Sequence, residues 1–164
     1  LESPNDLVKT GSDVLNKLLS KMGASAVVNL KNAHLEDIGG PVFDIDGDDS
    51  GLLIGRRGET LRAIQLMATM LVSSILGERV NMLIDISGYQ ERRYQTLRNL
   101  AQKVASRVIS TGNSIALEPM RANERRVIHM ALSDHDGIST ESTGKGLERR
   151  VVVEFSDAVG DEVP

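Results

Sequence analysis

The chain has 164 residues, of which 40% are hydrophobic and 26% charged, so it can form one folded domain or two small ones. Its formal net charge of −4 argues against a protein that coats nucleic acid through bulk positive charge. Aromatic residues make up 2% of the chain, which excludes a surface that stacks several bases on aromatic rings. The chain has no cysteine and no apolar run near the ~20 residues of a membrane helix. We therefore expect a cytoplasmic protein without disulfides or membrane insertion.

The N-terminal half predicts the element order helix, strand, strand, short helix, loop, helix and strand. Residues 1–11 are predicted to be a polar lead-in, and because the chain starts with Leu rather than Met we expect a fragment of a longer protein. The expected elements are a helix over 12–22, strands over 26–30 and 42–46, a helical turn over 52–54, a helix that ends at Gly77, and a strand over 80–86. Inward side chains of the helix before Gly77 are expected to be Leu61, Ile64, Ala68, Leu71 and Ile75.

The C-terminal half predicts a second small domain, with the junction at Gly88. The expected domains cover residues 12–87 and 88–156, and residues 157–164 form an acidic tail. The expected elements of the second domain are a helix over 90–110, a strand over 115–117, a helix over 122–133, and hairpin strands over 137–143 and 149–155. Inward side chains of its long helix are expected to be Leu97, Leu100, Ala101, Val104 and Val108.

A basic loop bracketed by glycines, Gly55-Arg56-Arg57-Gly58, lies between the helical turn and the helix that follows it. Glycines allow a sharp turn and let a sugar-phosphate backbone approach without a Cβ in the way. The loop leads into the N-terminus of a helix, where free amide hydrogens and the positive end of the dipole favour phosphate. Arg56 and Arg57 add charge-assisted hydrogen bonds to such a ligand. The alternative is an ordinary helix–turn–helix corner with two solvated arginines.

Apolar residues on both sides of the loop, Ile54 and Leu61, are expected to hold the two helices and direct the loop outward. With these flanks and this element order, residues 12–87 resemble a KH domain of the type II, or bacterial, arrangement. The resemblance implies helices packed on a three-stranded sheet, and a GXXG loop that clamps about four backbone nucleotides.

Arg125 and His129 are four residues apart on a predicted helix, so they share one of its faces. A guanidinium beside an imidazole provides donors for a phosphate or a base edge. The alternative is a partly buried His129 bonded to a backbone carbonyl, next to a solvated Arg125. Together with the preceding helix and strand and the following hairpin, this pair makes residues 88–156 resemble an R-three-H domain. That resemblance implies helices on a small three-stranded sheet and an association with single-stranded nucleic acid.

Three further arginines are assigned to the same candidate RNA-binding surface. Arg126 follows Arg125 on the helix. Arg149 and Arg150 resemble the basic pair that opens the last strand of R-three-H domains, and the alternative is a solvated charge pair on an edge strand.

The two domains in this order resemble the Jag (SpoIIIJ-associated) family of bacterial RNA-binding proteins. The segments that carry the resemblance are 52–61, LLIGRRGETL, and 124–132, ERRVIHMAL. The resemblance implies a cytoplasmic, non-enzymatic protein that binds single-stranded RNA, with single-stranded DNA as an alternative ligand and a second small KH protein as a partner. Members of the family usually carry a further small N-terminal domain, for which this chain has no room.

A polar stripe on the long helix of the second half is a candidate bridge between the two sites. Its members fall on one side of the helix at 100° per residue: Arg92, Thr96, Asn99, Lys103 and Arg107. The stripe could carry an RNA strand from the loop toward Arg125. The alternatives are a solvated helix face, which is the usual role of such stripes, and packing between the domains.

Other chemistries lack the residues that they need, and we expect neither a cofactor nor a metal. Asp44, Asp46 and Asp48 have the opening spacing of a calcium loop, but the required glycine and glutamate are missing. Two function classes therefore remain: a single-stranded RNA-binding protein acting in post-transcriptional regulation, and a KH-mediated interaction scaffold with weak nucleic-acid binding. Two arginines in the loop favour the first class, while the acidic net charge keeps the second open.

Overall fold

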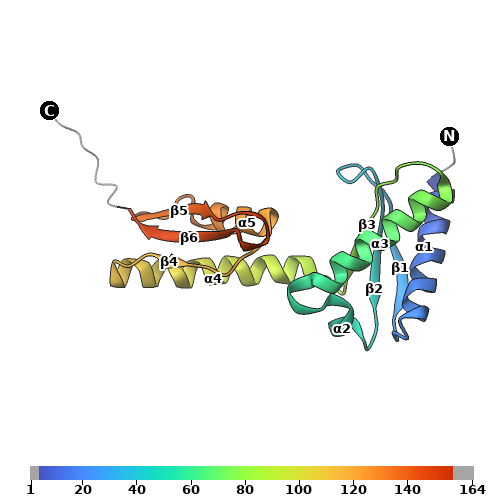
Figure 1. Cartoon of the computed structure of the whole chain (residues 1–164), viewed down its shortest axis with the longest axis horizontal. Coiled ribbons are helices and arrows are strands. Elements are labelled where there is room, and N and C mark those ends of the chain that lie inside the picture. The colour runs from blue at the N-terminus through green and yellow to red at the C-terminus, as the bar shows by residue number, and fades with distance from the viewer. Residues whose placement is uncertain (1–3, 157–164) are drawn as a thin grey trace. The chain divides into compact units, whose positions relative to one another are not determined.

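The computed structural model describes residues 4–156, which form two compact units divided after Glu91 (Figure 1). Five α-helices and two three-stranded sheets make up this part of the chain. The predicted α+β class, with helices on a small sheet in each half, is confirmed. Residues 157–164, predicted to form an acidic tail, lie outside the described residues.

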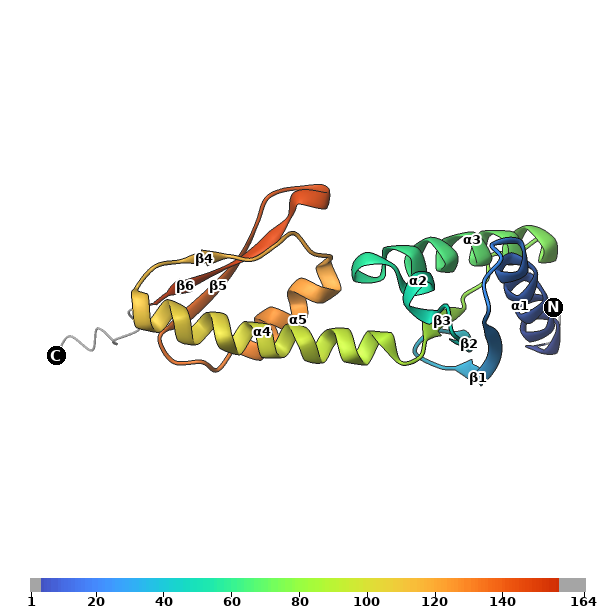
Figure 2. The same ribbon diagram turned by 90° about the horizontal axis from the view of Figure 1, so that it is seen from below.

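The N-terminal unit packs two helices against one face of its sheet (Figure 2). Its sheet has the order β1-β2-β3, with β1 antiparallel and β3 parallel to the central strand β2. Phe43 of β2 and Leu15 of α1 are fully buried between the layers. The elements of this unit are α1 (Pro4–Lys21), β1 (Val27–Leu35), β2 (Gly40–Asp46), α2 (Ser50–Ile54), α3 (Glu59–Leu76) and β3 (Leu83–Ile86).

Helix α1 begins at Pro4, so the predicted polar lead-in is wrong for residues 4–11, which form two more helical turns. Proline fits the first turn of a helix because its missing N–H has no partner there. Leu7 packs against the core. Gly11 is needed inside the helix because a Cβ at this position would lie 2.8 Å from the Phe43 ring. Both residues that usually interrupt a helix therefore fit here: Pro4 because it lies in the first turn, and Gly11 because it packs against Phe43.

Helix α3 turns a different face to the core than the one predicted. Leu61, Ile64 and Ala68 are buried as expected, and Val72 continues this face. Leu71 and Ile75 were expected inside and are exposed instead. They belong to an outward apolar surface, the α3 outer face, which consists of Leu66, Met67, Met70, Leu71 and Ile75, each 45–63% exposed. Spacing alone could not choose between the two faces because both are apolar.

The outer edge of strand β3 is covered by one side chain, that of Gln65 on α3. Its Nε2 donates to the Met82 carbonyl oxygen at 2.8 Å, and its Oε1 accepts from the Ile84 N–H at 2.7 Å. The amide therefore bonds to the strand as a neighbouring backbone would. Nε2 also reaches the Thr69 hydroxyl oxygen at 3.0 Å, which fixes the amide orientation.

The C-terminal unit packs α4 and α5 on one face of a sheet with the order β4-β6-β5, in which both pairings are antiparallel. Helix α4 begins before the division at Glu91 and continues into this unit. Ala105 takes an inward position, whereas Leu100, expected inside, is 38% exposed. The elements are α4 (Tyr89–Thr111), β4 (Ile115–Ala116), α5 (Ala122–Leu132), β5 (Ile138–Thr143) and β6 (Arg150–Phe155).

Candidate nucleic-acid interface

The glycine-bracketed loop joins α2 to α3 through a single 3-10 turn, Arg56–Gly58. Gly55 and Gly58 have φ values of 70° and 75°, in the left-handed region that glycine adopts without strain. A Cβ on Gly58 would also lie 2.7 Å from the Tyr89 ring, at the start of α4. Arg57 adopts φ 54° and ψ 30°, which a residue with a side chain reaches only at a cost. The loop is thus a strained turn packed on Tyr89.

The two loop arginines differ in exposure, contrary to the picture of two solvated side chains. Arg56 is exposed, whereas Arg57 is half-buried. The Arg57 carbonyl oxygen accepts a hydrogen bond from Arg62 Nη1 at 3.0 Å, which fixes the loop backbone to α3. Gly58, at the N-cap of α3, makes no side-chain cap bond, and the Glu59 N–H donates to the Arg56 carbonyl oxygen within the loop. What α3 offers an anion here is the positive end of its helix dipole. Glu59 lies in that turn and opposes part of this attraction.

His129 is held between two hydroxyl groups of β5. Its Nδ1 lies 2.7 Å from the Thr140 hydroxyl oxygen, and its Nε2 lies 2.8 Å from the Ser142 hydroxyl oxygen. Burial, and then the positive charge of Arg125, lower the pKa of His129 below its usual 6.5. The ring is therefore neutral at pH 7, and it joins α5 to the sheet. The ring is partly buried, as the alternative interpretation expected, but its partners are hydroxyls rather than a backbone carbonyl, and Arg125 is half-buried rather than solvated. A contact of His129 with RNA stays a prediction.

Arg125 carries one buried polar atom that its own surroundings do not satisfy. The residue is half-buried, and its Nε is buried without a hydrogen-bond partner among residues 4–156. A buried unpaired donor is costly, and such groups often mark binding sites. Arg126, one residue later, is exposed and points away from Arg125 because neighbouring residues on a helix lie 100° apart. The two arginine side chains therefore lie on different sides of α5.

Arg149 and Arg150 interact mainly with their own hairpin. Arg149 Nη1 donates to the Gly144 carbonyl oxygen at 2.8 Å. Arg150 donates to the Glu148 carbonyl oxygen and forms an ion pair of 3.3 Å with the Glu148 carboxylate. Both side chains are half-buried, so they hold the turn between β5 and β6 as well as contributing positive charge.

All five members of the polar stripe on α4 are exposed. Thr96 donates to the Arg92 carbonyl oxygen within its own helix. This exposure fits the solvated-face interpretation of the stripe and leaves its members accessible to a ligand.

An ion pair fixes the N-terminus of α5 to α4. Arg93 Nε donates to Glu124 Oε1 at 2.8 Å, and Glu124 is a buried charged residue, 7% exposed. The second carboxylate oxygen of Glu124 accepts from the Arg121 N–H at 3.2 Å. Farther along the helices, Gln102 Nε2 donates to the Ala131 carbonyl oxygen at 2.9 Å. These bonds set the spacing between the two helices.

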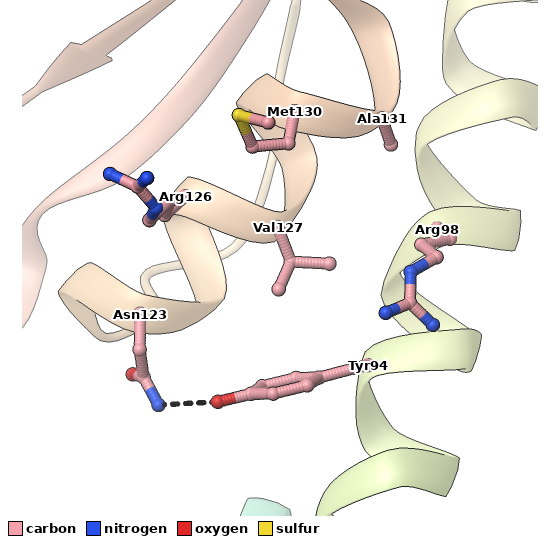
Figure 3. Close-up of a pocket in the computed structure, with 7 residues that line it drawn as sticks. All are labelled: Tyr94, Arg98, Asn123, Arg126, Val127, Met130 and Ala131. Atoms are coloured by element: carbon pink, nitrogen blue, oxygen red, sulfur yellow. Dashed lines mark hydrogen bonds between the residues drawn. The ribbon is translucent and has the colours of Figure 1, made fainter. Parts of the chain in front are cut away.

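A pocket of about 430 Å³ opens between α4 and α5 (Figure 3). Sequence reasoning identified Arg126 but missed the pocket, because its walls come from two helices whose pairing the sequence does not reveal. The one available signal was Tyr94, a rare aromatic residue four positions before Arg98 on the same helix face. The lining residues are Tyr94, Arg98, Asn123, Arg126, Val127, Met130 and Ala131.

Residues 4–156 offer neither a metal cluster nor a membrane helix. His, Asp and Glu side chains do not gather in this part of the chain into any group of three that could hold a metal ion. Within the same residues, none of the helices combines the length and apolar character needed to cross a membrane.

Comparisons with known proteins identify the class of protein to which this chain belongs. The family described as the R-three-H domain matches residues 95–154, which lie within the C-terminal unit. The chain is 38% identical over 110 residues to a protein of Clostridium symbiosum named RNA-binding protein KhpB, covering 67% of this chain and 50% of that protein.

Two more proteins with the same name are similar to this chain. The Bacillus subtilis protein is 38% identical over 113 residues, which are 68% of this chain and 54% of that protein. The Lactiplantibacillus plantarum protein is 33% identical over 148 residues, which are 89% of this chain and 44% of that protein. The chain belongs to the family of these proteins, the Jag family predicted from its sequence. It spans about half the length of these curated relatives.

Proposed function

We propose that this chain binds single-stranded RNA through the Gly55–Gly58 loop and the Arg125 face of α5, without catalysis, as a cytoplasmic post-transcriptional regulator. The observation that carries the proposal is the left-handed conformation of Arg57. Strained backbone persists where the surrounding structure enforces it, and it clusters at ligand-binding turns. Here the exposed Arg56 lies just before the N-terminus of α3, where the positive end of the helix dipole favours a phosphate.

The N-terminal unit is inferred to act as a KH domain, because its glycine-bracketed loop leads directly into a helix N-terminus. Such a loop contacts the sugar-phosphate backbone and leaves the bases of an unpaired strand accessible. The R-three-H domain adds Arg125, whose buried Nε has no hydrogen-bond partner among the described residues. The names of the relatives, which describe RNA binding, support this assignment.

The test compares the loop variant Arg56→Asp/Arg57→Asp with wild type by fluorescence anisotropy on a 12-nucleotide single-stranded RNA. Asp tolerates the left-handed conformation better than most residues, so Arg57→Asp adds little strain. We expect binding to weaken at least tenfold with unchanged melting. Lys21→Asp/Arg79→Asp, two exposed charge reversals outside the loop, is the matched control and should change affinity far less. Equal losses of RNA affinity in both variants would mean that the loop arginines act only through nonspecific charge, and would contradict the proposed loop contact.

A second candidate function is protein interaction through the α3 outer face. Met70 is 63% exposed among other apolar side chains, and exposed apolar patches of this kind mark interaction surfaces. The partner is proposed to be a second small KH protein. Met70→Glu should abolish co-elution with such a protein in gel filtration and leave RNA affinity unchanged. Leu147→Glu, at a 94% exposed site elsewhere, is the control and should co-elute normally.

A further inference from the structure

We propose that the pocket between α4 and α5 holds one unstacked nucleobase of a single-stranded RNA, with Tyr94 as the stacking surface. This inference rests on the proposed RNA-binding function and gives it a subsite in the R-three-H domain. The pocket volume of about 430 Å³ lies within the range of about 300–1,000 Å³ that is usual for ligand pockets.

The pocket walls are fixed by the core before any ligand binds. Tyr94, Val127 and Ala131 are half-buried and pack against the hydrophobic core of the C-terminal unit. Asn123 Nδ2 donates to the Tyr94 hydroxyl oxygen at 3.0 Å, so the ring is held from α4 to α5 (Figure 3). A preformed aromatic face loses little side-chain entropy when a base stacks on it. The geometry is therefore suited to a flat ring.

The rim of the pocket fits the charged backbone attached to a base. Arg98 comes from α4 and Arg126 from α5, so one guanidinium is carried by each wall. The charged residues of the lining are therefore both basic, and Asp and Glu are absent from it. The alternative ligand, an apolar side chain of a peptide, would leave both guanidinium groups without a role in binding. This combination of an aromatic ring, apolar walls and two guanidiniums favours a nucleotide.

The position of the pocket on α5 suits a strand that also meets Arg125. Arg125 and Arg126 are consecutive, and they lie toward the β5 side and the pocket side of the helix respectively. A strand crossing the N-terminal half of α5 would place a phosphate near Arg125 and a neighbouring base above Tyr94. The Asn123 amide is then at the base edge, where asparagine can form paired hydrogen bonds with adenine.

The first experiment titrates the full chain with adenosine 5′-monophosphate and, in parallel, with ribose 5-phosphate, which lacks the base. The methyl resonances of Val127, Met130 and Ala131 report on the pocket by NMR. We expect saturable shifts of these methyls with the nucleotide and much smaller shifts with the sugar phosphate. Equal chemical-shift changes with both ligands would show that the pocket binds only the phosphate, and would overturn the proposal.

The second experiment measures affinity for the 12-nucleotide RNA. Tyr94→Leu should weaken binding about 5-fold or more, since base–aromatic stacking is lost, and Tyr94→Phe should stay within about 2-fold of wild type. Because Tyr94→Leu also touches the core, Arg126→Gln provides a surface test, with Arg79→Gln as its matched control. Arg126→Gln should weaken binding about 3-fold or more, and the control should not.

The outcomes separate this proposal from the function on which it rests. Normal RNA affinity in folded Tyr94→Leu and in Arg126→Gln would overturn the pocket and leave RNA binding by the loop intact. Weak binding by the variant Arg56→Asp/Arg57→Asp, with unchanged methyl shifts from the nucleotide, would support two independent contacts. A wild-type chain that fails to bind the 12-nucleotide RNA would refute both proposals.

Discussion

Replacing His129 with alanine should destabilise the C-terminal unit more than it affects RNA contacts. Both ring nitrogens lie within 2.8 Å of a hydroxyl oxygen, on Thr140 and on Ser142. Each such hydrogen bond contributes about 0.5–1.5 kcal/mol, so the loss is expected to be about 1–3 kcal/mol. For a domain of this size that corresponds to a fall in Tm of roughly 5–20 °C. His34→Ala, at an exposed position of β1, should change stability by less than about 0.5 kcal/mol.

The measurement is denaturant unfolding followed through resonances of the C-terminal unit, combined with RNA affinity at pH 7.5. Thr140→Val and Ser142→Ala each remove one partner, and each should reproduce about half of the loss. The neutral ring has no charge to offer a phosphate, so affinity of the folded variant should stay within about 2-fold. Normal unfolding together with a large loss of affinity would refute this reasoning and place His129 in direct contact with RNA.

Acidification should reduce the stability that His129 contributes. The folded state lowers the pKa of this group below 6.5, so the unfolded chain binds the proton more readily than the folded chain. The contribution is therefore complete above pH 6.5 and decreases as the pH falls through that value toward the lower folded pKa. The difference in unfolding free energy between wild type and His129→Ala should narrow over this range. A difference that widened on acidification would mean that the folded state stabilises the imidazolium.

Three more substitutions test the loop and the helix pair. Arg57→Gly should leave stability unchanged or raise it by up to about 1 kcal/mol, because glycine relieves the left-handed strain, while RNA affinity falls. Gly58→Ala should destabilise the N-terminal unit by about 1–2 kcal/mol in chemical unfolding, whereas Gly51→Ala, in open space on α2, should be neutral or stabilising. Glu124→Ala should cost up to about 3 kcal/mol in the C-terminal unit by leaving Arg93 unpaired, and additivity with Arg93→Ala would contradict the pairing.

The parts of the fold that follow from local chemistry were predictable. Helix α3 begins after Gly58 and ends before Gly77, where left-handed glycines set both boundaries. The sequence could not show that α1 extends back to Pro4, because Gly11 looks like a residue that would interrupt a helix. The structure shows that glycine is required there, since a side chain would collide with the ring of Phe43, which is distant in the sequence. Nor could it show which face of α3 lies inside, because both faces are apolar. Val72 is buried in the core, whereas the neighbouring Leu71 is exposed.

In the candidate site, too, local spacing was predictable from the sequence and long-range contacts were not. The spacing of Arg125 and His129 placed them on one helix face, but only the structure shows that the histidine is hydrogen-bonded to β5 and that the Arg125 Nε has no partner among residues 4–156. The pocket required knowing that Tyr94 faces Asn123, residues 29 positions apart. Long-range pairing of this kind leaves no periodic trace in the sequence.

The Gln65 amide on β3 restricts how another chain can extend the N-terminal sheet. Strand addition requires free N–H and C=O groups along an edge, and Gln65 already occupies those of Ile84 and Met82. Strand addition beside β3 would have to displace the Gln65 amide, whereas β1, whose residues are mostly exposed, lies at the opposite edge of the sheet. Gln65→Leu would expose the β3 edge, and chains unfolding partially at high concentration would then have a new route to edge-to-edge aggregation.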